Sequence, residues 1–199
     1  MRPRLLIFAK EPVAGRVKTR LGRDIGMVEA AWWYRRRARS LIRALSADPR
    51  WETWIAVSPD RDGLESRFWP AHLPRWPQGR GDLGARMGRA FAAFPPGPLV
   101  IVGADIPDLE RRHVRAAFDA LGDADAVLGP AEDGGYWLIG LKRSPRRKPI
   151  RLFEGVRWST EHALADTEAG LAGLRIARLE TLRDVDDARD LAALRAGRR

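Results

Sequence analysis

Four basic side chains follow a short apolar stretch near the start of the chain: Lys10, Arg16, Lys18 and Arg20. They lie within eleven residues, in a segment that Pro12 and Gly15 mark as irregular. Such cations, together with backbone amides that glycine leaves accessible, bind the oxygens of phosphate groups. The segment is not a Walker A loop, because no glycine stands directly before Lys18. It predicts a phosphate-binding loop, and the alternative is a basic surface loop without a ligand.

A carboxylate follows a second apolar stretch, residues 99–103. Asp105 comes two residues after this stretch, and Pro107 prevents the chain from continuing as a strand. A carboxylate in this position suits Mg²⁺, which prefers one or two carboxylates completed by phosphate oxygens and water. The alternative is a cap on a helix that begins near Leu109, a role for which Asp108 is better placed. The pattern therefore predicts Asp105 as a metal ligand.

A third candidate segment, residues 129–137, contains the sequence Glu-Asp-Gly-Gly. Gly134 and Gly135 would let a ligand approach the backbone, while Asp133 or Glu132 binds a hydroxyl group or acts as a base. A plain hairpin turn explains the same residues without a function.

Ser159 and Thr160 stand at the start of a helical pattern. The favoured interpretation is a simple helix cap, and the alternative is anion binding at that helix end. Near the end of the chain, Asp184 and Asp186 alternate and so share one side of an extended segment. Capping of the following helix explains Asp186 or Asp187 equally well. No Ser-His-Asp arrangement or G-x-S-x-G motif is present.

Short apolar strands alternate with helical patterns along the chain. The expected strands are Leu5–Ala9, Thr53–Ser58, Leu99–Gly103, Ala126–Gly129, Tyr136–Leu141 and Arg175–Leu179. The expected helices are Val28–Leu45, Leu83–Phe94, Leu109–Leu121, Ser159–Gly170 and Asp187–Ala196. This alternation predicts an α/β fold with a mostly parallel central sheet and helices on both faces, in one domain spanning residues 1–199. Ligands of such sheets bind beyond the carboxyl ends of the strands, where the loops described above lie.

The composition excludes several classes of protein. The chain has 199 residues and no Cys, which removes disulfides, zinc ribbons and thiol nucleophiles. The apolar run after Arg4 is too short for a signal peptide, and no stretch approaches the roughly 18 residues of a membrane helix. A cytoplasmic protein without a membrane partner is therefore expected.

The net charge of +10 comes entirely from the first half of the chain. Residues 1–99 contain 19 Lys and Arg against 9 Asp and Glu, whereas residues 100–199 contain 17 of each. Five arginines of the expected helix 28–45 lie mostly away from its apolar stripe. A solvated helix face is the favoured interpretation of these arginines, and an acidic partner or nucleic acid is the alternative.

Several motifs recur in an order that resembles a known family. They read F-A-K-E-P-V-A-G-R-V-K-T-R-L, G-A-D-I-P-D-L, P-A-E-D-G-G-Y-W-L-I-G-L, W-S-T and D-V-D-D-A-R-D-L. Over nearly the whole chain they resemble the bacterial glycosyltransferase-A-like family whose members are labelled rSAM/selenodomain-associated transferase 1 or arsenosugar-biosynthesis glycosyltransferase. That family is similar in fold to nucleotide-diphospho-sugar transferases and to cofactor guanylyltransferases. The resemblance implies a Rossmann-like fold of the glycosyltransferase-A type.

The resemblance also assigns roles to particular residues. It implies that Gly15, Lys18 and Arg20 grip the phosphates of a nucleotide, and that Asp105 and Asp186 hold the metal ion. Contacts with the base and ribose are implied for Gln78, Leu83, Gly84 and Ala85. Two positions depart from the family pattern: the metal motif is Asp-Ile-Pro-Asp rather than Asp-x-Asp, and the usual Thr-Pro after the last Asp is Asp187-Ala188. Asp184 is the alternative second ligand.

The leading hypothesis is a transferase that depends on Mg²⁺ or Mn²⁺ and takes a nucleotide-sugar or nucleoside-triphosphate donor and a small-molecule acceptor. Lys18 and Arg20 would stabilise the departing phosphates and Asp133 would orient the acceptor. The full set of expected donor-binding residues is Lys10, Gly15, Arg16, Lys18, Arg20, Gln78, Gly84, Gly134, Gly135, Ser159 and Thr160. Glycosyl and nucleotidyl transfer both remain open.

Two alternatives belong to other classes. A nucleic-acid-binding module is motivated by the sequence pI of 11.1, although two Tyr and no recognisable stacking motif speak against it. A relative of the fold that has lost activity is the other, and the presence of Asp105, Lys18 and Arg20 speaks mildly against it. Nucleic acid is therefore not the expected partner.

Overall fold

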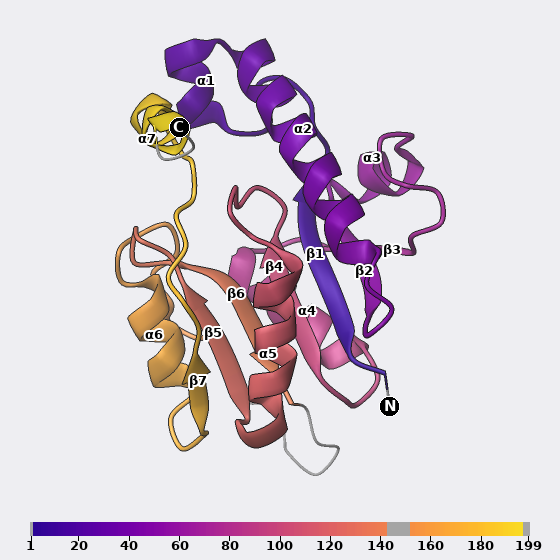
Figure 1. The fold of residues 1–199 in the computed structure, drawn as a ribbon, viewed down its shortest axis with the longest axis vertical. Helices are drawn as coiled ribbons and strands as arrows, with labels where there is room; N and C mark the ends of the chain where they lie inside the picture. Colours follow the sequence, from indigo (N-terminus) through magenta and orange to yellow (C-terminus); the bar gives the residue numbers. More distant parts are fainter. Residues whose placement is uncertain (1, 143–151, 197–199) are drawn as a thin grey trace.

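The computed structural model describes residues 2–142 and 152–196, which form a central sheet with helices around it (Figure 1). The strands are β1 (Arg4–Lys10), β2 (Glu52–Ser58), β3 (Arg75–Pro77), β4 (Leu99–Gly103), β5 (Ala126–Pro130), β6 (Tyr136–Leu141) and β7 (Ile176–Arg178). The helices are α1 (Thr19–Ile25), α2 (Met27–Ser46), α3 (Asp60–Glu65), α4 (Leu83–Ala93), α5 (Arg111–Asp123), α6 (Ala163–Gly170) and α7 (Ala188–Ala196).

The strands form one sheet in the order β3-β2-β1-β4-β6-β5-β7. Every neighbouring pair is parallel except the two pairs that include β6, which runs antiparallel to β4 and to β5. The predicted α/β class and mostly parallel sheet are therefore confirmed. All six expected strands are present, whereas β3, α1 and α3 were not predicted because each is too short to show a period.

Two apolar layers hold the helices against the sheet. On one face, strand residues such as Ile7, Val57 and Val102 pack with buried residues of α2 and α5. On the other face, Leu6, Ile101 and Ile139 pack with the buried side of α4 and with Leu171 after α6. These inward positions on both faces explain why residues 5–9 of β1 and the whole of β4 are apolar. The structure thus has helices on both faces of the sheet, as predicted.

The chain after β7 returns to the carboxyl end of the sheet. Leu182 forms a parallel bridge with Ala131 just beyond β5, and its backbone N–H donates to the carbonyl of Pro130 at 3.1 Å. This segment then reaches α7, which lies beside α1 (Figure 1). The C-terminal segment therefore brings residues 184–187 close to the loop that follows β1. None of the described helices is both long enough and apolar enough to cross a membrane.

Gly140 in β6 provides a test of the packing between the strands. A Cβ atom there would lie 2.7 Å from Val127 and 2.8 Å from Val100, closer than side chains tolerate. We expect Gly140→Ala to lower the free energy of unfolding by about 1–3 kcal/mol, because the core is overpacked. Gly122→Ala in α5 is the matched control, since no atom lies within 4 Å of its Cβ position. The control is expected to be neutral or stabilising in urea unfolding, and equal effects of the two changes would contradict this description.

Candidate functional site

A cleft of about 850 Å³ opens at the carboxyl ends of the central strands. Its walls come from the ends of β1 and β4, the start of α1, the loop between β5 and β6, the segment before α6 and the C-terminal segment. Twelve of the predicted site residues line it: Lys10, Lys18, Arg20, Gln78, Leu83, Asp105, Asp133, Gly135, Ser159, Thr160, Asp184 and Asp186. The fold therefore gathers side chains that are distant in the sequence.

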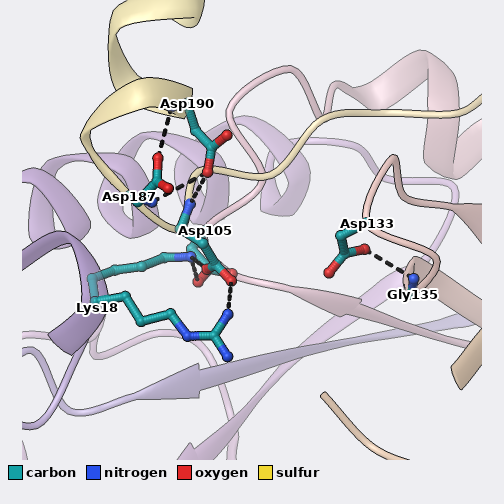
Figure 2. Close-up of polar contacts among 8 residues, drawn as sticks. Lys18, Asp105, Asp133, Gly135, Asp187 and Asp190 are labelled. Atoms are coloured by element: carbon teal, nitrogen blue, oxygen red, sulfur yellow. Dashed lines mark hydrogen bonds and ion pairs between the residues drawn. The ribbon is translucent and has the colours of Figure 1, made fainter. Parts of the chain in front are cut away.

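Lys18 lies between two carboxylates at the centre of this cleft (Figure 2). Its Nζ atom is 2.8 Å from Oδ2 of Asp105 and 3.1 Å from Oδ1 of Asp186. The second carboxylate also contacts Arg20, whose Nη1 is 3.3 Å from Oδ2 of Asp186. The Lys18 side chain is only 9% exposed, whereas Arg20 is 66% exposed. The buried cation thus contacts both acids, whereas the exposed cation contacts Asp186.

Both the charge and the backbone of Lys18 are unusual. Burial alone lowers the pKa of this ammonium group, but the charges and hydrogen bonds of Asp105 and Asp186 outweigh it and raise the pKa well above its usual range. Its backbone is left-handed, with φ 44° and ψ 48°. Among the described residues, the two non-glycine positions with positive φ are Lys18 and Ser159, and both line this cleft. Such strained positions concentrate at functional sites.

The backbone of Asp186 is fixed by the start of α7. Asp190 accepts hydrogen bonds from the backbone N–H groups of Asp186 and Asp187, at 2.8 and 3.2 Å. Asp187 in turn accepts one from the N–H of Asp190 at 3.0 Å, which gives a reciprocal cap. The capping role belongs to Asp187 and Asp190, and the carboxylate of Asp186 faces Lys18 instead.

Asp105 follows β4 directly, and a backbone hydrogen bond from Ala104 to Phe8 at 3.1 Å holds this turn against β1. The expected helix start near Leu109 was wrong by two residues, because α5 begins at Arg111 and Glu110 caps it together with His113. The predicted cap at Asp108 was therefore wrong as well. The prediction of Asp105 as a metal ligand does not depend on that cap, since the carboxylate of Asp105 contacts Lys18 in the cleft.

Two further carboxylates, those of Asp133 and Asp184, line the cleft. Asp133 is exposed, and its Oδ1 accepts a hydrogen bond from the backbone N–H of Gly135 at 2.9 Å (Figure 2). Asp184 lies nearby, and burial together with the charges of Asp186 and Asp133 raises its pKa to about 6. The cleft thus has a cationic side formed by the loop after β1 and an acidic side formed by the later loops.

Lys10 and Gln78 lie at the β1 end of the cleft. The backbone N–H of Lys10 donates to the hydroxyl of Tyr34 at 2.9 Å. The side chain of Lys10 takes no part in this hydrogen bond and is exposed. Gln78 is buried, and its side-chain amide donates to the carbonyls of Ala56 and Ala9 at 2.7 and 3.3 Å. Gln78 therefore ties the ends of β1 and β2 together beside the cleft.

Four predicted donor-binding residues do not line the cleft. Arg16 is exposed and pairs with Asp62 of α3 at 3.1 Å, while Gly15 forms a turn with φ 77°. Gly84 packs against Trp158, whose ring lies 2.7 Å from the position of a Cβ atom. Gly134 has φ 82° and packs against the backbone of Glu161. The geometry gives both of these glycines a packing role.

Ser159 and Thr160 line the cleft, but neither caps a helix. The expected helix start at Ser159 was wrong, because α6 begins at Ala163. The Thr160 hydroxyl closes a turn instead: it donates to the carbonyl of Arg157 at 2.8 Å and accepts from the N–H of His162 at 3.2 Å. Ser159 adopts a left-handed backbone with φ 61°, which lies outside the right-handed helical region.

Sequence reasoning missed the aromatic wall of the cleft. Tyr136 and Trp158 line it, with ring centroids 6.3 Å apart, and Phe153 packs behind Trp158 at 5.9 Å. Arg86 and Glu161 also line the cleft and were not singled out. Tyr136 was predicted as the start of a strand and Trp158 as part of a helix start, and nothing in their spacing shows that they meet. The W-S-T motif, which begins at Trp158, was the available signal.

The donor set of the acidic side fits a hard divalent cation. Asp105 and Asp186 turn one oxygen each towards the same point, which the ammonium group of Lys18 holds. Two carboxylates completed by phosphate oxygens and water are the ligands that Mg²⁺ prefers. No group of three His, Cys, Asp or Glu side chains suited to a metal ion occurs within residues 2–142 and 152–196. The arrangement therefore suits a metal ion that arrives with a phosphate-bearing ligand.

Fold and cleft together define a Rossmann-like structure of the type found in nucleotidyl and sugar transferases. Residues 41–160 match the family described as "Uncharacterized protein conserved in bacteria (DUF2064)", and the chain belongs to this family. A search of curated protein sequences found no match.

Solved structures extend the comparison to the whole chain. A proposed nucleotide-diphospho-sugar transferase from Desulfovibrio desulfuricans G20 is 32% identical, with a TM-score of 0.84 over 97% of this chain and 86% of that one. A nucleotidyl transferase from Methanothermobacter thermautotroptrophicus is 14% identical, with a TM-score of 0.61 over 98% and 97% of the two chains. The protein Rv0371c from Mycobacterium tuberculosis H37Rv, crystallised in complex with manganese, is 15% identical, with a TM-score of 0.55 over 97% of each chain. The last two likenesses concern the fold alone.

Proposed function

We propose that this protein is a metal-dependent glycosyltransferase that uses a nucleotide-diphosphate sugar as donor. The observation that carries the proposal is the position of Lys18 between Asp105 and Asp186, at the end of the central strands. Such a group offers one cation for phosphate oxygens and two carboxylates for Mg²⁺ or Mn²⁺. The 32% identical structure, which is described as a nucleotide-diphospho-sugar transferase, supports the same donor class.

The diphosphate of the donor would lie on the cationic side of the cleft. Lys18 and Arg20 bind the phosphate oxygens there, and Lys10 is close enough to the same wall to extend this positive surface. Asp105 and Asp186 would hold the metal ion, which neutralises charge on the phosphates when it is bound. During transfer an acceptor oxygen bonds to the anomeric carbon, and the bond from that carbon to the β-phosphate oxygen breaks. The nucleoside diphosphate leaves with the electron pair, which Lys18 and Arg20 stabilise.

The opposite side of the cleft suits a neutral acceptor that carries hydroxyl groups. Asp133 and Glu161 offer carboxylate oxygens that accept hydrogen bonds, and Tyr136 and Trp158 offer flat apolar surface. Asp133 would orient the attacking hydroxyl group and take up its proton. An acceptor with its own phosphate would meet several carboxylates here, with Arg86 as the cation available on the α4 side. This acidic wall favours glycosyl transfer.

Nucleotidyl transfer is the second candidate, and the cations of the β1 side favour it. Lys10, Lys18 and Arg20 provide more positive charge than a diphosphate needs. In this reaction an acceptor oxygen attacks the α-phosphorus of a nucleoside triphosphate, the bond to the bridging oxygen breaks, and pyrophosphate departs. The same residues hold metal and phosphates in both reactions, so the donor distinguishes them.

A thermal-shift screen with Mg²⁺ tests the donor class directly. Nucleotide sugars and nucleoside triphosphates are compared at equal concentration, because a ligand that binds the native state raises the melting temperature in proportion to its affinity. We expect a nucleotide sugar to stabilise the protein selectively, and less strongly when EDTA replaces Mg²⁺. Selective stabilisation by a nucleoside triphosphate would instead establish the nucleotidyl reaction. Stabilisation by neither class would contradict both.

A further inference from the structure

A second basic site lies away from the cleft, on the outer face of α2. Arg35, Arg39 and Arg43 follow one another at intervals of four residues and so form a ridge along the helix. The acidic residue of α2 is Glu29, which lies in the first turn, before the ridge begins. Like charges at this spacing repel one another, so the ridge is an arrangement that costs helix stability. A solvated helix face normally alternates acids and bases and avoids this cost.

The C-terminal part of the ridge, Arg39 and Arg43, borders a hollow of about 260 Å³. Arg39 and Arg43 line it from α2, and Arg67 lines it from the loop after α3, with Phe68 and Trp69 as its aromatic wall. Within the part of the chain that the structure describes, none of these three arginines is paired with a carboxylate. No acidic residue lines the hollow either. Three guanidinium groups therefore surround one small space without a counter-charge from the described residues.

Aromatic contacts hold part of this group in place. The guanidinium carbon of Arg39 lies 5.3 Å from the centroid of the Phe68 ring, and that of Arg35 lies 4.7 Å from it. Phe68 is itself buried and packs edge-on against Trp69, with ring centroids 4.6 Å apart. A guanidinium group that is already positioned loses less freedom when a ligand binds. The hollow is thus a partly organised binding site for an anion.

The hollow and the cleft are separate. None of the residues that line the hollow lines the cleft. Tyr34 connects the same helix with the cleft, but its side chain is buried, whereas Arg39 and Arg43 are exposed. An anion in the hollow therefore does not occupy the site of the nucleotide donor.

We propose that Arg39, Arg43 and Arg67 bind the phosphate group of a small molecule at a second site on α2. Guanidinium groups offer paired N–H donors that match the oxygens of a phosphate, and three such groups can share one dianion. The size of the hollow suits one or two phosphate groups rather than a folded partner. A bound phosphate group also neutralises the mutual repulsion of the three arginines. We expect this relief of repulsion to add to the affinity that the hydrogen bonds provide.

Calorimetry with inorganic pyrophosphate in the presence of EDTA tests this site. The pocket variant is Arg43→Gln/Arg67→Gln, which keeps Arg39 on Phe68, and the matched control is Arg23→Gln/Arg36→Gln, which removes the same charge outside the hollow. We expect the pocket variant to weaken binding at one site about tenfold or more, and the control to leave it within about twofold. Binding in the cleft is identified separately as the part lost in Lys18→Ala.

Three results would overturn the proposal. Equal weakening in the pocket variant and the control would reduce the effect to net charge. Loss of all pyrophosphate binding in Lys18→Ala, with no change in the pocket variant, would leave the cleft as the single site. A pocket variant that weakens a single-stranded oligonucleotide but not pyrophosphate would make the ridge a nucleic-acid surface. Failure of this site leaves the donor screen unaffected, so the two proposals are tested independently.

Discussion

Replacing Asp105 by Asn is expected to reduce kcat/KM by about a thousandfold or more, or about 4 kcal/mol of transition-state stabilisation. The change keeps the size of the side chain but removes the charge that faces Lys18 at 2.8 Å and, in the proposed mechanism, the metal ion. A loss of metal affinity should therefore accompany the loss of turnover. The measurement is transfer from the donor selected in the thermal-shift screen, at saturating and at limiting Mg²⁺.

Neighbouring carboxylates supply the controls. Asp186→Asn should resemble Asp105→Asn, because its carboxylate faces the same point at 3.1 Å. Asp119→Asn changes an exposed carboxylate of α5, whose ion pair with Arg115 spans one helix turn, and should leave activity unchanged. Asp184→Asn shows which of the two alternating acids is the second ligand, and we expect its effect on metal affinity to be smaller than that of Asp186→Asn. Normal turnover in folded Asp105→Asn would refute the assignment of the site.

Replacing Lys18 by Met is expected to move two affinities in opposite directions. Nucleotide affinity should fall by about 1–3 kcal/mol, because a charge-assisted contact with the phosphates is lost, and kcat should fall by about 10²- to 10³-fold. Mn²⁺ affinity without nucleotide should rise, because the ammonium group no longer competes for Asp105 and Asp186. Calorimetry with Mn²⁺ alone and with nucleotide alone measures the two effects separately.

The control for Lys18 separates this competition from damage to the fold. Arg20→Met removes an exposed cation from the same acid and should change Mn²⁺ affinity much less, since Asp105 keeps Lys18 as its partner. Melting temperatures of both variants are compared with that of the wild type. Lower affinity for Mn²⁺ in Lys18→Met, or unchanged affinity for nucleotide, would contradict the role given to this residue.

Strand pattern and loop chemistry predicted most of the fold. The strands that form the centre of the sheet are continuous apolar runs, and such runs are visible without any knowledge of their neighbours. The antiparallel direction of β6 was not predicted, because a strand's direction depends on which neighbour it joins. Two helix starts were displaced: Glu110 caps α5, and α6 begins after a turn that Thr160 closes. Local side-chain bonds of this kind leave little trace in the sequence.

The sequence allowed each loop of the candidate site to be predicted, but not the contacts between residues of different loops. Lys18 and Asp186 are 168 residues apart, and their pairing depends on the C-terminal segment, which returns beside β5 and places α7 against α1. Position after a strand identified Asp105 and Asp133, since strand ends meet at one edge of a sheet. The left-handed backbone of Lys18 could not be read from its residue type, because that conformation is unfavourable for lysine.

The excess positive charge has two locations in the structure. Part of it surrounds the acids of the cleft, where Lys18 and Arg20 are paired. Another part forms the ridge on α2, which the sequence presents as an ordinary solvated face and the structure shows beside a hollow without a carboxylate in its lining. Net charge alone therefore suggested one large polyanion, whereas its placement supports two small phosphate-bearing ligands.

In the proposed function, metal and nucleotide bind together on Lys18, Asp105 and Asp186. Calorimetric titration with the nucleoside diphosphate of the selected donor, with Mg²⁺ and with EDTA, tests it most directly in the wild type and in Asp105→Asn. We predict tight binding with Mg²⁺ in the wild type, binding at least about tenfold weaker with EDTA, and little dependence on Mg²⁺ in Asp105→Asn. Equal affinity with Mg²⁺ and EDTA in the wild type, or an unchanged Mg²⁺ dependence in Asp105→Asn, would contradict it.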